Sequence, residues 1–264
     1  PRSVIDLDET ILEFFDRSLS AEGLRPEASV RVFVTGRNEW ITDESTAVIG
    51  TGVLPMYLHS ELGANTRRGD GVLLRVPAAQ AAVSVITDNP AVPVEFQPRF
   101  ISFAAGANPL EFTLEQMHLT GRDEALVYTS EPLEKTLTAC GRPKVVLTVR
   151  TDASDADLFV LLSDSFPLGL RDLHLSHAAV RLRTLSSFQP GKLISIEMEL
   201  DPIAHEFHEG HQLRVTVTPS LFPLYARNLH LSEYLMGRDP SVADIEVHCG
   251  PDAPSQLMLP VRLG

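Results

Sequence analysis

Residues 212–218 read QLRVTVT, and this stretch decides the fold class. Leu213, Val215 and Val217 alternate with polar or charged residues, and this period of two places successive side chains on opposite faces of a β-strand. The alternation predicts a half-buried strand, with one face on a core and the other in solvent.

Similar segments recur on both sides of this strand. From Val30 onward, short β-branched runs alternate with Gly, Pro, Asn and Asp, which is the layout of an antiparallel sandwich. The predicted strands are Val30–Thr35, Val53–Leu58, Ala125–Thr129, Lys144–Thr151, Leu158–Leu162, Ala178–Arg183, Leu193–Leu200, Gln212–Thr218 and Gln256–Val261. We therefore expect an all-β sandwich in one main domain, as is common for sandwiches of this length.

One helix is predicted, and it comes first. Asp6 or Asp8 can cap its N-terminus, and Gly23 with Pro26 can end it. Its apolar residues recur at helical spacing: Ile11, Leu12, Phe15 and Leu19. The chain starts at Pro1 without a methionine and enters this pattern almost at once, so we expect a piece of something longer.

Composition argues against several classes of partner. With 22 basic against 35 acidic residues, the formal net charge of -13 gives no electrostatic reason to bind nucleic acid or an anionic membrane. No apolar run reaches the ~18 residues of a spanning helix, and no basic-then-apolar signal opens the chain. Cys140 and Cys249 form no Cys-x-x-Cys pair, so neither a disulfide framework nor a zinc site is expected, and a reducing cytoplasm fits.

The cluster HEFHEGH at residues 205–211 carries the residue types that bind zinc. It differs from the helical His-Glu-x-x-His arrangement because Glu209 stands where the second His should be, and Gly210 breaks the element just before a strand. The favoured interpretation is an ordinary polar hairpin turn. The alternative is a metal site built on the three imidazoles: His205, His208 and His211.

No serine nucleophile is indicated. The Gly-x-Ser-x-Gly elbow of an α/β-hydrolase is absent, and Ser163 and Ser165 flank Asp164 without its glycines, as polar positions at a strand end do. No glycine-rich phosphate loop of either common type occurs. We expect no catalytic residue, no metal and no cofactor in this chain.

Phe96–His118 is expected to be a long excursion from the sandwich, and excursions of this length are usually functional or disordered. It carries more Phe than a solvated loop should: Phe96, Phe100, Phe103 and Phe112. These are candidates for a substrate-pocket wall or a domain interface, and the alternative is that they plug one end of the core. For Trp40, the single tryptophan, core or interface packing is favoured over stacking on a ligand.

Six stretches, taken in order, carry a family resemblance. They are ILEFFDRSL (11–19), VRVFVTGRNEW (30–40), LVYTSEPLEKTLTACG (126–141), TDASDADLFVLLSD (151–164), GHQLRVTVTPSLFPLYARNLH (210–230) and PSQLMLPV (254–261). They resemble, over nearly the whole chain, the C-terminal half of the X-Pro dipeptidyl-peptidase and cocaine-esterase-like (CocE/NonD) serine hydrolases. Two stretches depart from the family pattern and leave the substrate class open: FPLGLRDLHLSHAAVRLR (166–183), which lacks an Asp-Gly-x-Ala turn, and residues 96–118.

The resemblance implies a galactose-binding-like jelly roll over residues 23–264. Residues 1–22 then correspond to the terminal helix of a preceding α/β-hydrolase domain. In such enzymes the Ser, Asp and His of the triad lie in that domain, so all three are expected before Pro1. The parent enzyme would be a peptidase, an esterase or an acylase.

The same resemblance implies a partner for the apolar candidates. The jelly roll would pack on the hydrolase domain and help to wall the pocket for a small ester, amide or peptide substrate. Residues 96–118, with Ile11, Phe14 and Phe15, are expected to form the surface that meets this domain. The alternative is an independent carbohydrate- or ligand-binding jelly-roll module, which would not need an apolar-faced first helix.

Overall fold

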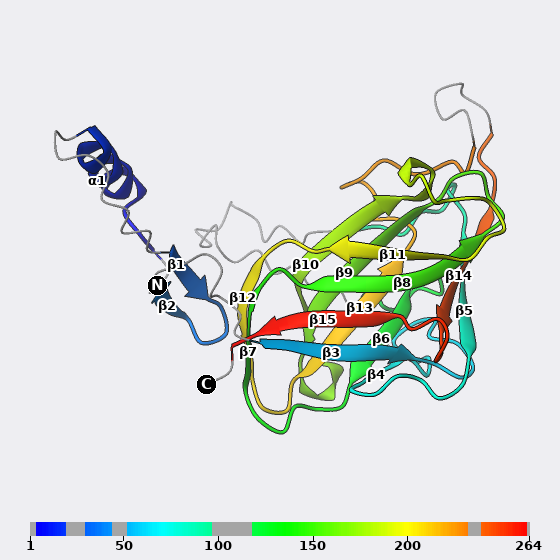
Figure 1. Ribbon diagram of the computed structural model, residues 1–264, viewed down its shortest axis with the longest axis horizontal. Coiled ribbons are helices and arrows are strands. Elements are labelled where there is room, and N and C mark those ends of the chain that lie inside the picture. Colours follow the sequence, from blue (N-terminus) through cyan, green and yellow to red (C-terminus); the bar gives the residue numbers. More distant parts are fainter. Residues whose placement is uncertain (1–3, 20–29, 44–51, 97–117, 232–238, 263–264) are drawn as a thin grey trace.

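The computed structural model describes residues 4–19, 30–43, 52–96, 118–231 and 239–262, and one helix precedes a run of β-strands (Figure 1). The N-terminal elements are α1 (Leu7–Leu19), β1 (Val30–Val34) and β2 (Glu39–Asp43). The sandwich begins with β3 (Gly52–His59), β4 (Val72–Leu74), β5 (Ala82–Asp88), β6 (Leu126–Ser130), β7 (Leu137–Gly141), β8 (Lys144–Thr151) and β9 (Asp157–Ser165). It continues with β10 (Asp172–Arg181), β11 (Ile194–Glu199), β12 (Ile203–Phe207), β13 (Gln212–Thr218), β14 (Ala243–Cys249) and β15 (Gln256–Val261).

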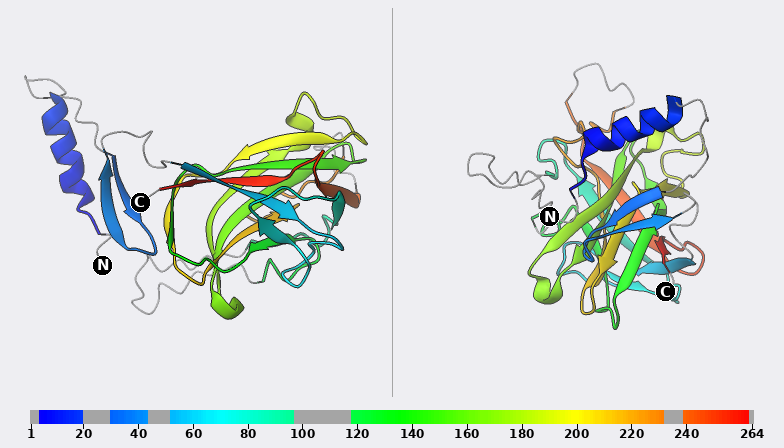
Figure 2. Two further views of the ribbon diagram at one scale, coloured as in Figure 1. Left: turned by 60° about the horizontal axis from the view of Figure 1, so that its bottom comes forward. Right: turned by 90° about the vertical axis from the view of Figure 1, so that its left-hand side faces the viewer.

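The sandwich strands form one continuous hydrogen-bonded path. Its order is β10-β9-β13-β6-β4 and then β3-β15-β8-β14-β5, with β11 beside β8 and with β7 between β15 and β12. Among the described strands, every ladder is antiparallel apart from β4 with β6. The path folds back on itself, so that its first half faces its second half (Figure 2). The fold is the all-β sandwich that the sequence predicts.

The main core lies between these two halves. Val160 of β9 and Val215 of β13 share one cluster with Leu147 of β8 and Val247 of β14, and all four are fully buried. Burying one aliphatic side chain of this size stabilises the fold by about 1.5–3 kcal/mol. The alternating residues on which the strand predictions depend are therefore the ones that hold the two layers together.

A second hydrophobic cluster covers the outer face of the layer that contains β9, β13 and β6. Phe159 and Leu161 of β9 and Val127 of β6 face this cluster. The residues that cover them come from connecting segments: Val94, Phe96, Leu119, Ala125 and Leu221. As a result, every residue of β9 is buried.

This outer cover makes the half-buried interpretation of β13 wrong. Arg214 and Thr216, which alternation places on the solvent face, are only 7% and 2% exposed. Arg214 donates from Nη1 to both carboxylate oxygens of Asp172 and from Nε to Thr129 Oγ1, 2.9 Å away. A buried guanidinium is tolerated here because it is paired and hydrogen-bonded.

Each strand predicted from the sequence is confirmed, with shifted ends. The largest shift is in β10, which begins at Asp172 rather than Ala178. The strands that the sequence did not predict are β2, β4, β5, β7, β12 and β14. In β5 the reason is physical: Ser84 and Asp88 point inward while Val83 and Val85 are exposed, which inverts the usual pattern.

α1 and the β1–β2 hairpin lie beyond one end of the sandwich (Figures 1 and 2). Asp6 caps the predicted helix, because its Oδ1 accepts a hydrogen bond from the Glu9 amide at 3.0 Å. Gly23 and Pro26 lie outside the described residues. Gly36 follows the hairpin's first strand at φ +83°, and a Cβ there would collide with the Glu206 carbonyl of β12. No helix within the described residues is long and apolar enough to cross a membrane.

Candidate functional site

Asp164, near the end of β9, joins two histidines of the HEFHEGH cluster. Its Oδ2 lies 3.1 Å from His205 Nε2, and its Oδ1 lies 2.9 Å from His211 Nδ1. All three side chains are buried. Because an ionised carboxylate only accepts hydrogen bonds, His205 donates from Nε2 and His211 from Nδ1.

Thr35 extends this cluster to the N-terminal hairpin. Its Oγ1 lies 2.8 Å from His205 Nδ1, and its backbone bonds to β12 in both directions, to the Ala204 carbonyl and from the Glu206 amide. Hydroxyl, imidazole and carboxylate therefore follow one another from Thr35 through His205 to Asp164. The Thr35 hydroxyl also lies 3.1 Å from the Ala204 carbonyl, so its single proton has two acceptors within reach and the hydroxyl serves to attach the hairpin.

The hairpin-turn interpretation of residues 205–211 is wrong in its first half. His205 belongs to β12, which pairs with β7, whereas the turn after it leads to β13 in the opposite layer. Of the three histidines, only His208 keeps the exposed position expected of a turn, with its Nδ1 3.8 Å from Glu206 Oε1. Within the described residues, no three His, Cys, Asp or Glu side chains converge as metal ligands.

A cavity of about 530 Å³ opens beside this junction. Val32 and Phe33 of β1 line one side, Leu175 of β10 and Ile203 of β12 line the other, and His205 contributes its buried imidazole. The cavity is thus mainly apolar, and the hairpin forms part of its wall.

A second histidine pair lies on the outer face of β10. A β-bulge between His174 and Ser176 turns His174 and His177 toward the same side, with ring centroids 5.4 Å apart. His177 Nε2 lies 3.0 Å from the Tyr225 hydroxyl. Burial, with a smaller contribution from neighbouring His177, lowers the pKa of His174 to about 3, so this imidazole is neutral at physiological pH.

Phe96 packs against the same pair and is 5% exposed, inside the second hydrophobic cluster. Its ring centroid is 5.6 Å from that of His174. Phe96 therefore covers the outer face of one layer rather than one end of the main core. The other three candidates, Phe100, Phe103 and Phe112, lie outside the described residues.

The apolar residues of α1 and the aromatic residue of the hairpin are placed differently. Phe14 and Phe15 contact each other edge to face at 5.6 Å but remain 57% and 51% exposed. Trp40 of β2 packs on Phe33 of β1, with ring centroids 5.4 Å apart, and the Arg31 guanidinium lies over its ring. Trp40 therefore stabilises the hairpin, as the packing interpretation expects.

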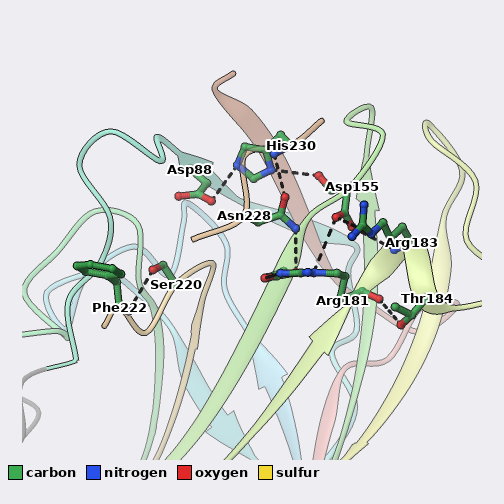
Figure 3. A network of polar contacts seen from close by, with 10 residues as sticks. Asp88, Asp155, Arg181, Arg183, Thr184, Ser220, Phe222, Asn228 and His230 are labelled. Atoms are coloured by element: carbon green, nitrogen blue, oxygen red, sulfur yellow. Dashed lines mark hydrogen bonds and ion pairs between the residues drawn. The ribbon is translucent and has the colours of Figure 1, made fainter. Parts of the chain in front are cut away.

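A network of ionic contacts holds the loops at the opposite end of the sandwich (Figure 3). Arg181 of β10 makes two hydrogen bonds to Asp157 of β9, and Asn228 Nδ2 donates to the same carboxylate at 2.8 Å. Arg183 Nε lies 3.2 Å from Asp155 Oδ2. Asn228 is therefore the residue that joins the connection after β13 to this network.

His230 completes this network. Its Nε2 lies 2.9 Å from Asp88 Oδ2, and its Nδ1 lies 3.1 Å from the Asp155 carbonyl (Figure 3). Burial of the ring by itself lowers the pKa of His230, but the contacts with Asp88 and Asp155 outweigh burial and raise it above the ordinary value. The protonated form balances the charge of the surrounding carboxylates.

Sequence reasoning missed Asp164, Asp157 and His230 as organising residues. Asp164 was interpreted as a polar position at a strand end, although it is 1% exposed. The only available signal was a carboxylate inside the apolar run LFVLLSDS, where an unpaired charge would be costly. The partners of that carboxylate lie far from it in the sequence, so no spacing pattern indicates them.

A model of the family described as X-Pro dipeptidyl-peptidase C-terminal non-catalytic domain matches residues 22–258. The chain is also 29% identical over 259 residues to a cocaine esterase of Rhodococcus sp. (strain MB1 Bresler). This match covers 94% of the chain but 44% of that protein, so the chain spans less than half the length of this relative.

Solved structures give the same picture. An aminopeptidase from the marine sediment archaeon Thaumarchaeota archaeon aligns with a TM-score of 0.78 at 25% identity, over 97% of this chain and 44% of its own. An α-amino acid ester hydrolase aligns with a TM-score of 0.75 at 29% identity, over 96% and 44%. A CocE/NonD family hydrolase from Staphylococcus aureus shares the fold at 15% identity with a TM-score of 0.60, over 97% and 45%.

Proposed function

Because the chain belongs to the family of X-Pro dipeptidyl-peptidase C-terminal non-catalytic domains, we propose that it serves as the accessory domain of a serine hydrolase. The substrates of that hydrolase would be esters, amides or X-Pro peptides. The catalytic Ser, His and Asp would lie in an α/β-hydrolase domain upstream of Pro1. A location in the reducing cytoplasm is part of the proposal, and the free thiols of Cys140 and Cys249 are consistent with it.

The observation that carries the proposal is the apolar surface of α1. Large apolar side chains are exposed just before α1 and along it: Val4, Ile5, Leu7, Ile11, Leu12, Phe14, Phe15 and Leu19. A contiguous apolar surface of this kind usually marks an interface, and burial of each such side chain is worth about 1.5–3 kcal/mol. An upstream catalytic domain would cover it, and would make residues 1–22 part of that domain.

The extent of the relatives supports the same partner. The cocaine esterase and the α-amino acid ester hydrolase each extend over more than twice the part that this chain matches. Thr35 fixes the N-terminal hairpin to β12, and the Asp164 cluster lies behind it, which supports a structural role for this end of the sandwich. The remaining length of such a hydrolase would provide the nucleophile.

Residues 96–118 would contribute apolar wall to the substrate pocket of that domain. Phe96 packs inside the second hydrophobic cluster, so it would anchor the segment rather than contact substrate. Phe100, Phe103 and Phe112 remain the candidates for substrate contact.

The test is to produce this chain and the upstream part of its coding sequence as two polypeptides and to measure their association by size-exclusion chromatography. We expect the two polypeptides to co-elute, and we expect the paired substitutions Leu12→Asp and Phe15→Asp to abolish their co-elution. Substitution of two exposed valines on β5, Val83→Asp and Val85→Asp, is the matched control and should leave association intact. An upstream sequence without a Gly-x-Ser-x-Gly-type elbow would contradict the proposal.

A further inference from the structure

A groove that shares no lining residue with the cavity at the N-terminal junction opens beside the main core. Its volume is about 550 Å³, within the range of about 300–1,000 Å³ that small-molecule sites occupy. Leu54, Leu133 and Leu137, which are partly exposed, line the groove and pack on the buried core residues Met56, Leu73 and Leu213. The groove therefore offers apolar contacts that continue directly into the interior of the sandwich.

The wall formed by the β6–β7 connection is held in place without a ligand. The Leu133 amide donates to the His211 carbonyl at 2.8 Å, and the Leu133 carbonyl accepts from the Gly210 amide at 2.9 Å. At the base of this wall, Ser130 Oγ accepts from the Leu213 amide at 3.0 Å. His211 is in turn fixed by Asp164. A site with fixed walls loses little entropy when a ligand binds.

The rim of the groove carries charges of both signs. Arg75 and Lys135 supply two cations, and Glu131 and Glu134 supply two carboxylates. All four side chains are exposed, and none forms an ion pair with another described residue. Elsewhere on the same surface, Arg37, Arg122 and Lys144 are each paired with a neighbouring carboxylate.

We propose that this groove binds a small zwitterion with apolar side chains, of the class of short peptides with free termini. The apolar side chains would contact the partly exposed leucines Leu54, Leu133 and Leu137. The ligand carboxylate would contact Arg75 or Lys135, and its ammonium group would contact Glu131 or Glu134. A fatty acid would meet two carboxylates at the rim, and an apolar amine would meet two cations, so each satisfies half of the rim.

The test is a titration of the 264-residue chain, followed by the NMR signals of its leucine methyl groups. Leucyl-leucine is compared with N-acetyl-leucyl-leucine, which lacks the ammonium group, and with leucyl-leucine amide, which lacks the carboxylate. Physiological ionic strength limits the influence of the net charge, because the Debye length is then about 8 Å. We expect saturable shifts in the millimolar range for leucyl-leucine, as suits a ligand with few heavy atoms.

Each blocked probe should bind at least about threefold more weakly, the effect of losing one exposed ion pair. Lys135→Gln should weaken the binding of leucyl-leucine but should not weaken the binding of leucyl-leucine amide, which has no carboxylate to lose. Lys192→Gln, at an exposed lysine outside the groove, is the control and should change neither affinity. Absence of saturable shifts with leucyl-leucine would overturn the proposal that the groove binds a peptide. Equal affinity for all three peptides would overturn the proposal that the rim recognises both charged termini.

Discussion

Arg181 and Asp157 stand opposite each other in the register of β10 and β9, and their side chains are joined as well as their strands. Arg181 Nε lies 2.8 Å from Asp157 Oδ1, and Nη2 lies 2.7 Å from Oδ2. This two-pronged contact is the strongest geometry available to a guanidinium and a carboxylate. The Asp157 carboxylate also accepts from Asn228, so the ion pair belongs to the network that includes Arg181, Asn228 and His230 in Figure 3.

Asp157→Asn should lower the free energy of unfolding by about 1–3 kcal/mol, because it removes the charged two-pronged partner of Arg181 and leaves Asp155, whose Oδ2 is 3.8 Å from Arg181 Nε, as the remaining carboxylate. Glu39→Gln removes the partner of Arg37 in an exposed pair and should cost at most about 1 kcal/mol. Urea unfolding of both variants measures the difference. An equally small loss of unfolding free energy in both variants would contradict the prediction that the network stabilises the fold more than an exposed ion pair does.

His230 should make the protein less stable as the pH rises. The pKa of His230 is raised in the folded protein above the ordinary value of 6.5. Its protonation therefore stabilises the fold fully below pH 6.5, and this stabilisation disappears as the pH rises through the folded pKa. The difference in unfolding free energy between the wild type and His230→Gln should shrink over that range. A difference that does not change with pH would be the opposite result.

His174 should have the reverse effect in acid. Its pKa falls from 6.5 to about 3 on folding, so the unfolded chain binds one proton more than the folded chain between these pH values. The wild type should then lose about 1.4 kcal/mol per pH unit relative to His174→Leu as the pH falls from 6.5. His208→Gln, at an exposed histidine, serves as the control. Parallel acid-unfolding curves for the wild type and His174→Leu would contradict this prediction.

Phe100 and Phe103 should act on substrate choice rather than on folding. If they wall the pocket of the proposed hydrolase, their replacement by Ala in the longer protein should change the ratio of kcat/KM values between substrates, with little loss of stability. If they fill a core instead, each replacement should cost about 3–5 kcal/mol and leave selectivity unchanged. Steady-state kinetics and thermal unfolding of the same samples separate the two outcomes.

The sandwich could be predicted from sequence wherever apolar residues alternate toward a single core. Val215 and its neighbours on β13 follow that rule. The rule fails where a face carries polar groups that are buried and paired, as for Arg214 with Asp172. It fails again in β5, where Ser84 and Asp88 point inward.

The polar clusters could not be predicted because their members are brought together only by the fold. Asp164 and His211 are neighbours through the pairing of β9 with β13, and His205 reaches them from β12. The HEFHEGH stretch did indicate a cluster of polar side chains. It did not indicate that Asp164 would be the residue that joins His205 to His211.

The most direct test of the central claim is a hydrolysis assay of the 264-residue chain alone, with activated esters and X-Pro anilides. We expect background rates, because Thr35 is the only hydroxyl within hydrogen-bond distance of His205 among the described residues, and it also lies 3.1 Å from the Ala204 carbonyl. The longer protein should turn over at least one of these substrates and lose that activity to a serine-reactive inhibitor. Turnover by the isolated chain that the same inhibitor abolishes would contradict the claim that its catalytic residues lie elsewhere.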